Sequence, residues 1–67
     1  MANGQVQLIT RDDAIEFLQS VALQAVQAQE LVRQGALSAA ADLLDDIRRD
    51  AQRAENIIVA LEALQEY

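Results

Sequence analysis

Residues 28–44 read AQELVRQGALSAAADLL, in which a single glycine, Gly35, divides two helix-forming segments. Glycine adopts the left-handed conformation that ends a helix at low steric cost, and Arg33 in the preceding turn complements the negative end of the helix dipole. Ser38 is predicted to cap the following helix, with Asp42 in its early turns. Because such a short link joins two long helices, this stretch predicts an antiparallel helical hairpin.

Apolar residues recur at alternating spacings of four and three on both sides of the glycine, which keeps one face of an α-helix apolar. The pattern predicts a helix over about residues 11–34, a turn over 35–38 and a second helix over about 39–65. The chain is rich in Ala, Leu, Gln and Glu and has no proline, so the expected fold class is all-α. The two stripes are Ala14, Leu18, Val21, Ala25, Ala28 and Val32, and then Ala40, Leu44, Ile47, Ala51, Ala54, Ile58 and Leu61.

The apolar arc of the first helix covers roughly half of its circumference, which is wider than the contact between two helices needs. Two helices of this length cover only part of each other's apolar surface, so the remainder is expected to meet a second copy or another protein. We therefore predict that the hairpin dimerises into a four-helix bundle. The residues predicted for the hairpin or dimer core are Ile15, Leu18, Val21, Ala25, Val32, Leu44, Ile47, Ala51, Ala54, Ile58 and Leu61.

A reversal of the chain near the glycine sets which parts of the helices face each other. Ala22 and Ala25 fall opposite residues 48–51, so the middle of the contact is predicted to be lined by alanine. Larger side chains are predicted at both ends of the contact: Ile15 and Leu18 with Ile58 and Leu61, and Leu31 and Val32 with Leu43 and Leu44. Small residues either bring the helix axes close together or leave room for a side chain of another chain, and close packing is the preferred interpretation.

The N-terminal segment, residues 1–9, is predicted to be a flexible tail, and the alternative is a strand that adds to the sheet edge of a partner. The first helix is expected to begin after Thr10. This residue stands three positions before Asp13, which suggests a capping box. Asp12 and Asp13 also lie where the helix dipole is positive.

The composition excludes several kinds of chemistry. No cysteine or histidine occurs among the 67 residues, so disulfides, zinc fingers and imidazole catalysis are excluded, and no cofactor or metal is expected. Eleven acidic residues against five arginines give a net charge of −6, which disfavours nucleic acid and anionic membranes as partners. The sequence contains no apolar run of membrane-spanning length and no secretory leader pattern, so a cytoplasmic location is expected.

Carboxylates near the edge of the second apolar stripe allow two interpretations. Asp46 and Asp50 lie within reach of Arg49 and Arg53 at a spacing of three, which gives a hydrated rim of weak ion pairs. The alternative is that Asp46 or Asp50 meets an arginine across an interface and fixes its register. Neither interpretation makes an active site, because two helices do not build the water-excluding cleft that acid–base catalysis needs.

The expected function is therefore protein binding without catalysis, as an adaptor, chaperone or inhibitor that acts through amphipathic helix faces. The alternative is an obligate subunit of a heteromeric complex. The predicted partners are a second copy of the chain and another protein. A stripe on the outer side of the first helix is predicted to bind that protein, and it consists of Leu23, Gln27, Glu30 and Leu31. The alternative for the two leucines is that they are ordinary exposed apolar residues.

Two short stretches carry a resemblance to a known family. Glu30, Leu31, Val32 and Arg33 precede Gly35, and the later run is Ala54, Glu55, Asn56, Ile57 and Ile58. Together with the small acidic hairpin they resemble the small co-chaperones of type III secretion needle subunits. The resemblance implies a helical hairpin that pairs with a second chaperone and keeps a needle protein soluble. Small phage or bacterial anti-activators that clamp a regulator are similar in shape.

Overall fold

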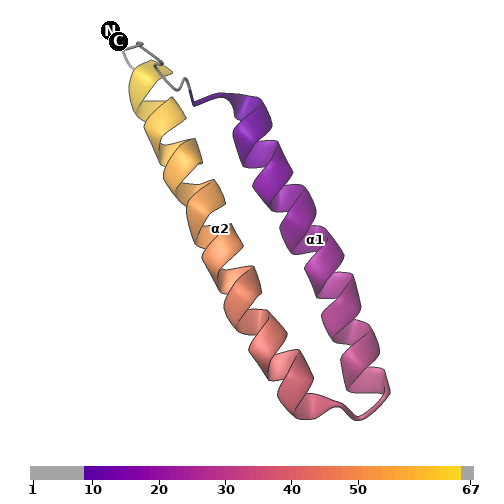
Figure 1. Ribbon diagram of the computed structural model, residues 1–67. Coiled ribbons are helices and arrows are strands. Elements are labelled where there is room, and N and C mark those ends of the chain that lie inside the picture. The colour runs from indigo at the N-terminus through magenta and orange to yellow at the C-terminus, as the bar shows by residue number, and fades with distance from the viewer. Residues whose placement is uncertain (1–8, 66–67) are drawn as a thin grey trace, which may run out of the picture.

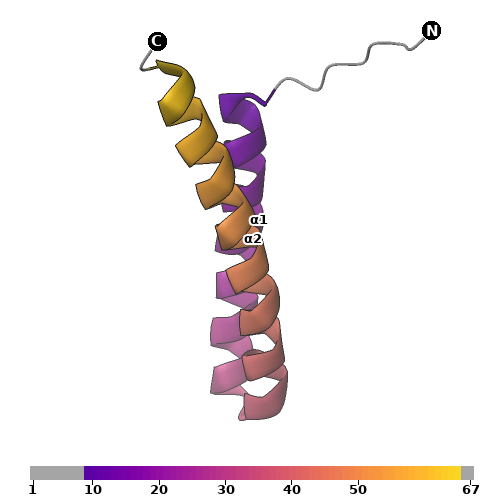
Figure 2. The same ribbon diagram turned by 90° about the vertical axis from the view of Figure 1, so that its left-hand side faces the viewer.

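The computed structural model describes residues 9–65, which form two helices (Figure 1). α1 runs over Arg11–Arg33 and α2 over Leu37–Gln65. The helices lie side by side and antiparallel, so the start of α1 and the end of α2 share one end of the molecule. The view turned by 90° shows no third element of the described chain over either face of the pair (Figure 2). The predicted all-α hairpin is confirmed, and residues 1–8 of the predicted tail lie outside the described residues.

The start of α1 is fixed by the predicted capping box. The Thr10 hydroxyl accepts a hydrogen bond from the backbone N–H of Asp13 at 3.4 Å. The Asp13 carboxylate in turn accepts one from the backbone N–H of Thr10 at 2.9 Å. Two backbone donors that the helix leaves free are satisfied in this way, and Asp12 and Asp13 place negative charge at the positive end of the dipole.

The turn is closed by two backbone hydrogen bonds around Gly35. The N–H of Gly35 donates to the carbonyl of Val32 at 3.0 Å, and the N–H of Ala36 donates to the carbonyl of Leu31 at 2.9 Å. This pair of bonds is the Schellman motif, and it requires a left-handed residue, which Gly35 supplies with φ of +80°. The glycine therefore ends α1 as the sequence predicts.

The second helix begins earlier than predicted. α2 starts at Leu37 instead of residue 39, and the N–H of Ala40 already donates to the carbonyl of Ala36 at 3.1 Å. Ser38 lies inside the first turn of α2 and does not cap it, which corrects the prediction. The reason is that the Schellman motif completes the reversal at Ala36, so the next residue is already free to be helical.

The contact between the helices, which we call the seam, is formed by two rows of residues on each helix. Positions in these rows alternate in spacing between three and four, and all are buried or half-buried. On α1 they are Ala14, Phe17, Val21, Gln24, Ala28 and Leu31, and on α2 they are Ala40, Leu43, Ile47, Asp50, Ala54, Ile57 and Leu61. Every fully buried residue among those described is an alanine, and Ala54 is the most buried with 1% of its surface exposed.

Only one of the two rows in each predicted stripe lies in the seam. The row that contains Ala14, Val21 and Ala28 packs against α2, whereas the row that contains Leu18 and Val32 is exposed. A single neighbouring helix covers a stripe only about two rows wide. The second row of the seam contains Leu31 and Leu43, which were predicted to meet near the turn, but its other members lie outside the predicted stripes and include the polar residues Gln24 and Asp50.

The distribution of small and large side chains also differs from the prediction. Among the buried alanines, Ala14 lies near the free ends and Ala28 and Ala40 lie near the turn, whereas Ala54 lies three residues beyond the middle of α2. The alanine-lined middle is therefore wrong, because Ala22 is exposed. A polar contact between the helices occupies that level instead.

Neither α1 nor α2, over the described residues, combines enough length with enough apolar character to cross a bilayer.

Candidate protein-binding surface

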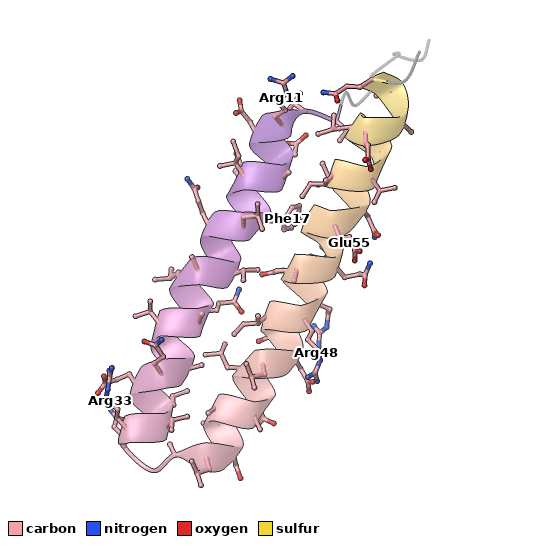
Figure 3. The ribbon with its side chains drawn as sticks, turned by 180° about the vertical axis from the view of Figure 1, so that it is seen from behind. Arg11, Phe17, Arg33, Arg48 and Glu55 are labelled. Carbon is pink, nitrogen blue, oxygen red and sulfur yellow. The ribbon has the colours of Figure 1, made fainter. Side chains whose placement is uncertain are left out.

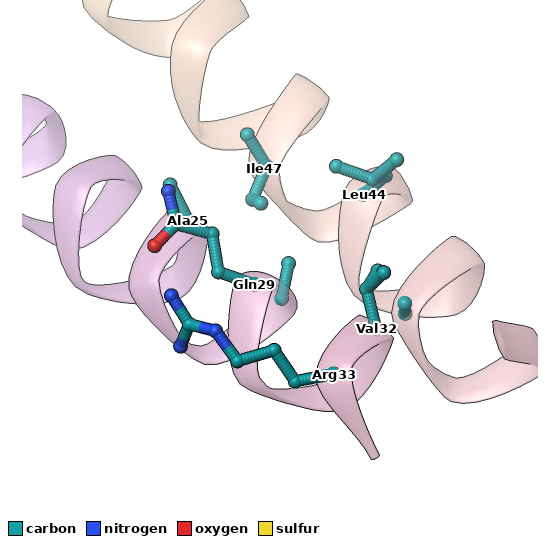
Figure 4. Close-up of a pocket in the computed structure, with 8 residues that line it drawn as sticks. Ala25, Gln29, Val32, Arg33, Leu44 and Ile47 are labelled. Carbon is teal, nitrogen blue, oxygen red and sulfur yellow. The ribbon is translucent and has the colours of Figure 1, made fainter. Parts of the chain in front are cut away.

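Among the hollows on the described part of the hairpin, two are lined mainly by apolar side chains. The hollow near the turn has a volume of about 660 Å³ (Figure 4) and is lined by Ala25, Ala28, Gln29, Val32, Arg33, Ala40, Leu44 and Ile47. The hollow near the free ends has a volume of about 520 Å³ and is lined by Arg11, Ala14, Ile15, Leu18, Ile58, Leu61, Glu62 and Gln65. Each hollow takes residues from both helices, so the two-helix packing creates it.

The two hollows lie on the same side of the hairpin. Leu18 of one hollow is seven residues before Ala25 of the other, and Ile58 is fourteen residues after Leu44. In packed helices, residues seven apart share a face. Ala51 stands midway between Leu44 and Ile58 and therefore joins the hollows into one surface. We call this surface the apolar flank, defined as Ile15, Leu18, Ala22, Ala25, Val32, Leu44, Ala51 and Ile58.

The apolar flank leaves large side chains in water. Ile15 is 48% exposed and Ile58 is 46% exposed, and Leu18, Val32 and Leu44 are exposed to a similar degree. Scattered exposed apolar residues are common on proteins, but a continuous apolar surface on this scale marks an interaction site. The apolar flank is therefore the part of the described chain that is best suited to bind another protein surface.

The opposite side of the seam carries a polar contact. The Asp50 carboxylate accepts a hydrogen bond from the Gln24 side-chain amide at 2.7 Å and another from the Ser20 hydroxyl at 3.0 Å. The Gln24 amide also donates to the Ser20 hydroxyl at 2.8 Å. We call these three residues the polar cluster. It holds α1 against α2 in one axial position, because a shift along the helices would break both bonds to Asp50.

The polar cluster explains how a carboxylate is tolerated in the seam. The hydrogen bond from Gln24 lowers the pKa of Asp50 below its ordinary value, and the bond from Ser20 and the nearby Arg53 act in the same direction. The side chain of Asp50 keeps 20% of its surface exposed, so it stays partly hydrated. The partners of Asp50 across the hairpin are a hydroxyl and an amide of the same chain, and an arginine across an interface stays a prediction.

Ion pairs cover the rest of this side. Arg53 lies 3.9 Å from Asp50 and places its guanidinium 5.9 Å from the centre of the Phe17 ring. Figure 3 shows Phe17 directed from α1 toward α2. Arg49 lies 3.7 Å from Asp46 on the surface, which matches the predicted rim of weak ion pairs. A polar side of this kind is satisfied by water and its own neighbours, in contrast to the apolar flank.

The predicted outer binding stripe is not brought together as one exposed surface. Leu23 is 61% exposed, and Gln27 and Glu30 are exposed as well. Glu30 forms an ion pair with Arg33 at 3.0 Å. Leu31 is half-buried in the seam, so it lies away from Leu23. The role of these residues in binding stays a prediction.

The described residues show no cluster that could hold a metal ion. No group of three or more acidic side chains converges among residues 9–65.

No family model, curated protein or solved structure matches the chain. The resemblance to needle co-chaperones therefore stays a prediction from the sequence.

Proposed function

We propose that the protein is a non-enzymatic protein-binding module of the adaptor, chaperone or inhibitor class, and that it works as a homodimer. In the dimer, the apolar flanks of two hairpins pack together into a four-helix bundle. The observation that carries the proposal is the apolar flank itself, where Ile15, Leu18 and Ile58 stay about half exposed beside a seam that buries only alanines completely.

The energetics of a lone hairpin support this proposal. Ordering a residue costs about 1.5 kcal/mol, and apolar burial returns only about 25 cal/mol for each Å². No large side chain among the described residues is fully buried, so the seam alone recovers little of that cost. When a second hairpin packs on the apolar flank, both copies bury more apolar surface. No residue has to be ordered beyond those that already form the two hairpins. Small domains commonly use oligomerisation in this way.

Light scattering coupled to size-exclusion chromatography, together with circular dichroism, tests the proposal. At micromolar concentration we expect a helical species with twice the chain mass of 7.4 kDa. A well-folded helical monomer would refute the homodimer. An isolated chain that is unfolded or aggregated would instead point to the alternative function, an obligate subunit that folds only with a different partner.

A further inference from the structure

We infer that the second copy packs antiparallel on the apolar flank, with α2 lying on α2 of the other copy and the twofold axis passing beside Ala51. This inference rests on the proposed dimer and adds the orientation of its subunits. We place the twofold axis perpendicular to the helices. A residue that lies a given number of positions before the midpoint of α2 then faces the residue the same number of positions after the midpoint in α2 of the second copy. Ala51 is the middle residue of Leu37–Gln65, so this placement overlaps the two α2 helices along their full length.

Charges along the edge of α2 support this orientation. Arg48 and Glu55 are seven residues apart and border the apolar flank on α2. Figure 3 shows both on the side of α2 away from α1. An antiparallel pairing centred on Ala51 places Arg48 within one residue of the level of Glu55 of the second copy, which is within reach of these long side chains. The twofold axis repeats the pair, so two interchain ion pairs form at the edges of the bundle.

Apolar side chains are complementary in the same register. Leu44 falls opposite Ile58 of the second copy, and Ala51 falls opposite its own counterpart, where a small side chain lets the two helices approach closely. The hydrogen bond between Ser20 and Asp50 fixes the level of α1 relative to α2. At that level Ile15 falls within one residue of Ala22 of the second copy, so a large side chain lies beside a small one.

The hollows pair in the same way. The hollow near the free ends of one copy lies over the hollow near the turn of the other. The exposed Ile58 at the first therefore lies beside Leu44 at the second, twice in the dimer. Each copy supplies the side chains that fill the hollow of its partner, as expected for a twofold interface.

The other twofold arrangement gives Arg48 and Glu55 no interchain partner. When the twofold axis runs parallel to the helices, α1 of one copy packs on α2 of the second copy. Residues at the same height along the hairpin then face each other. The contact between Ser20 and Asp50 then places Arg48 opposite Ala22 and Glu55 opposite Ile15. Arg48 and Glu55 would then lose hydration at the edge of the interface without gaining an interchain ion pair. The antiparallel arrangement of α2 on α2 is therefore the better match.

Cysteine cross-linking tests the orientation, because the natural chain contains no cysteine. The Ala51→Cys variant is expected to form a disulfide-linked dimer under mild oxidation with glutathione, since a disulfide needs its two Cα atoms within about 7 Å. The matched control is Gln52→Cys, whose exposed position is adjacent in sequence but turned by about 100° around the helix. We expect much less linked dimer from it.

A charge swap gives an independent readout by sedimentation equilibrium. Arg48→Glu is expected to weaken the dimer about tenfold, and adding Glu55→Arg to the same chain is expected to restore it. Arg48 also pairs with Asp45 in its own helix, and the double variant does not repair that pair. The control is therefore Arg49→Glu, which removes the similar intrahelical pair with Asp46 but lies off the edge of the flank, and it should leave the dimer unchanged.

The outcomes separate the orientation from the dimer itself. A natural chain that is monomeric would refute the proposed function. A dimer in which Ala51→Cys links no better than Gln52→Cys, and in which the charge swap restores nothing, would refute the antiparallel orientation alone.

Discussion

Replacing Ile58 with serine distinguishes between a hairpin that stays monomeric and a hairpin whose apolar flank is covered by a second copy. Ile58 is 46% exposed in the hairpin, so a free hairpin gains little from the buried part of this side chain. Full burial of an isoleucine contributes about 2 kcal/mol, so covering the exposed half contributes about 1 kcal/mol for each copy. The dimer contains two copies, and Ile58→Ser is therefore expected to weaken it by about 2 kcal/mol, or roughly thirtyfold.

The matched control is Val59→Ser. Val59 is next in sequence and 55% exposed, but it lies on neither the seam nor the apolar flank. Serine, valine and isoleucine have similar helix propensities, so the intrinsic helical cost is nearly the same in both variants. Sedimentation equilibrium of the two variants and the natural chain gives the dimer dissociation constants. Equal dissociation constants for Ile58→Ser and Val59→Ser would refute the covered flank.

Further predictions concern the turn, the polar cluster and the outer side of α1. Gly35→Ala is expected to lower the free energy of unfolding by about 1–2 kcal/mol, measured in denaturant titrations. The cause is the φ of +80° at this residue, since no atom lies within 4 Å of an added Cβ. An unchanged denaturation midpoint would contradict the assigned turn. Since the pKa of Asp50 is lowered in the folded chain, its ionised carboxylate contributes to the free energy of unfolding. This contribution is complete above the ordinary aspartate pKa of about 3.9 and is lost as the pH falls through the lowered pKa. We expect Gln24→Leu to raise the pKa of Asp50, measured by carboxyl-carbon NMR; no shift would mean that the amide does not hold the carboxylate. Leu23→Ser is expected to leave helicity and dimer mass unchanged, and a loss of dimer would place Leu23 in that interface.

The turn and the fold class were predictable because they depend on local rules. Gly35 ends α1 through a backbone conformation that other residues adopt only with strain, and Thr10 with Asp13 starts α1 through hydrogen bonds over three residues. Neither feature depends on the tertiary packing of the two helices. The start of α2 was misplaced because Ser38 is a common cap, whereas the Schellman motif had already reversed the chain at Ala36.

The composition of the seam was only half predictable, because apolar spacing alone does not choose between neighbouring rows. The row of Leu18 is more apolar than the row of Gln24, yet the row of Gln24 faces α2. The choice depends on a cross-helix match, in which Ser20 and Gln24 donate to Asp50 at one level of the hairpin. A pattern within one helix does not contain that match. The spacing of three and four from Ala14 through Gln24 was present in the sequence, but it included polar residues.

The dependence of thermal stability on protein concentration shows whether a second copy covers the apolar flank. If folding and dimerisation are coupled, the midpoint of thermal unfolding followed by circular dichroism rises as the protein concentration is raised from about 1 to 100 μM. A hairpin that is stable by itself unfolds at the same temperature throughout that range. We expect the midpoint to rise, and a midpoint independent of concentration in a fully helical sample would show that the flank is not covered by a second copy.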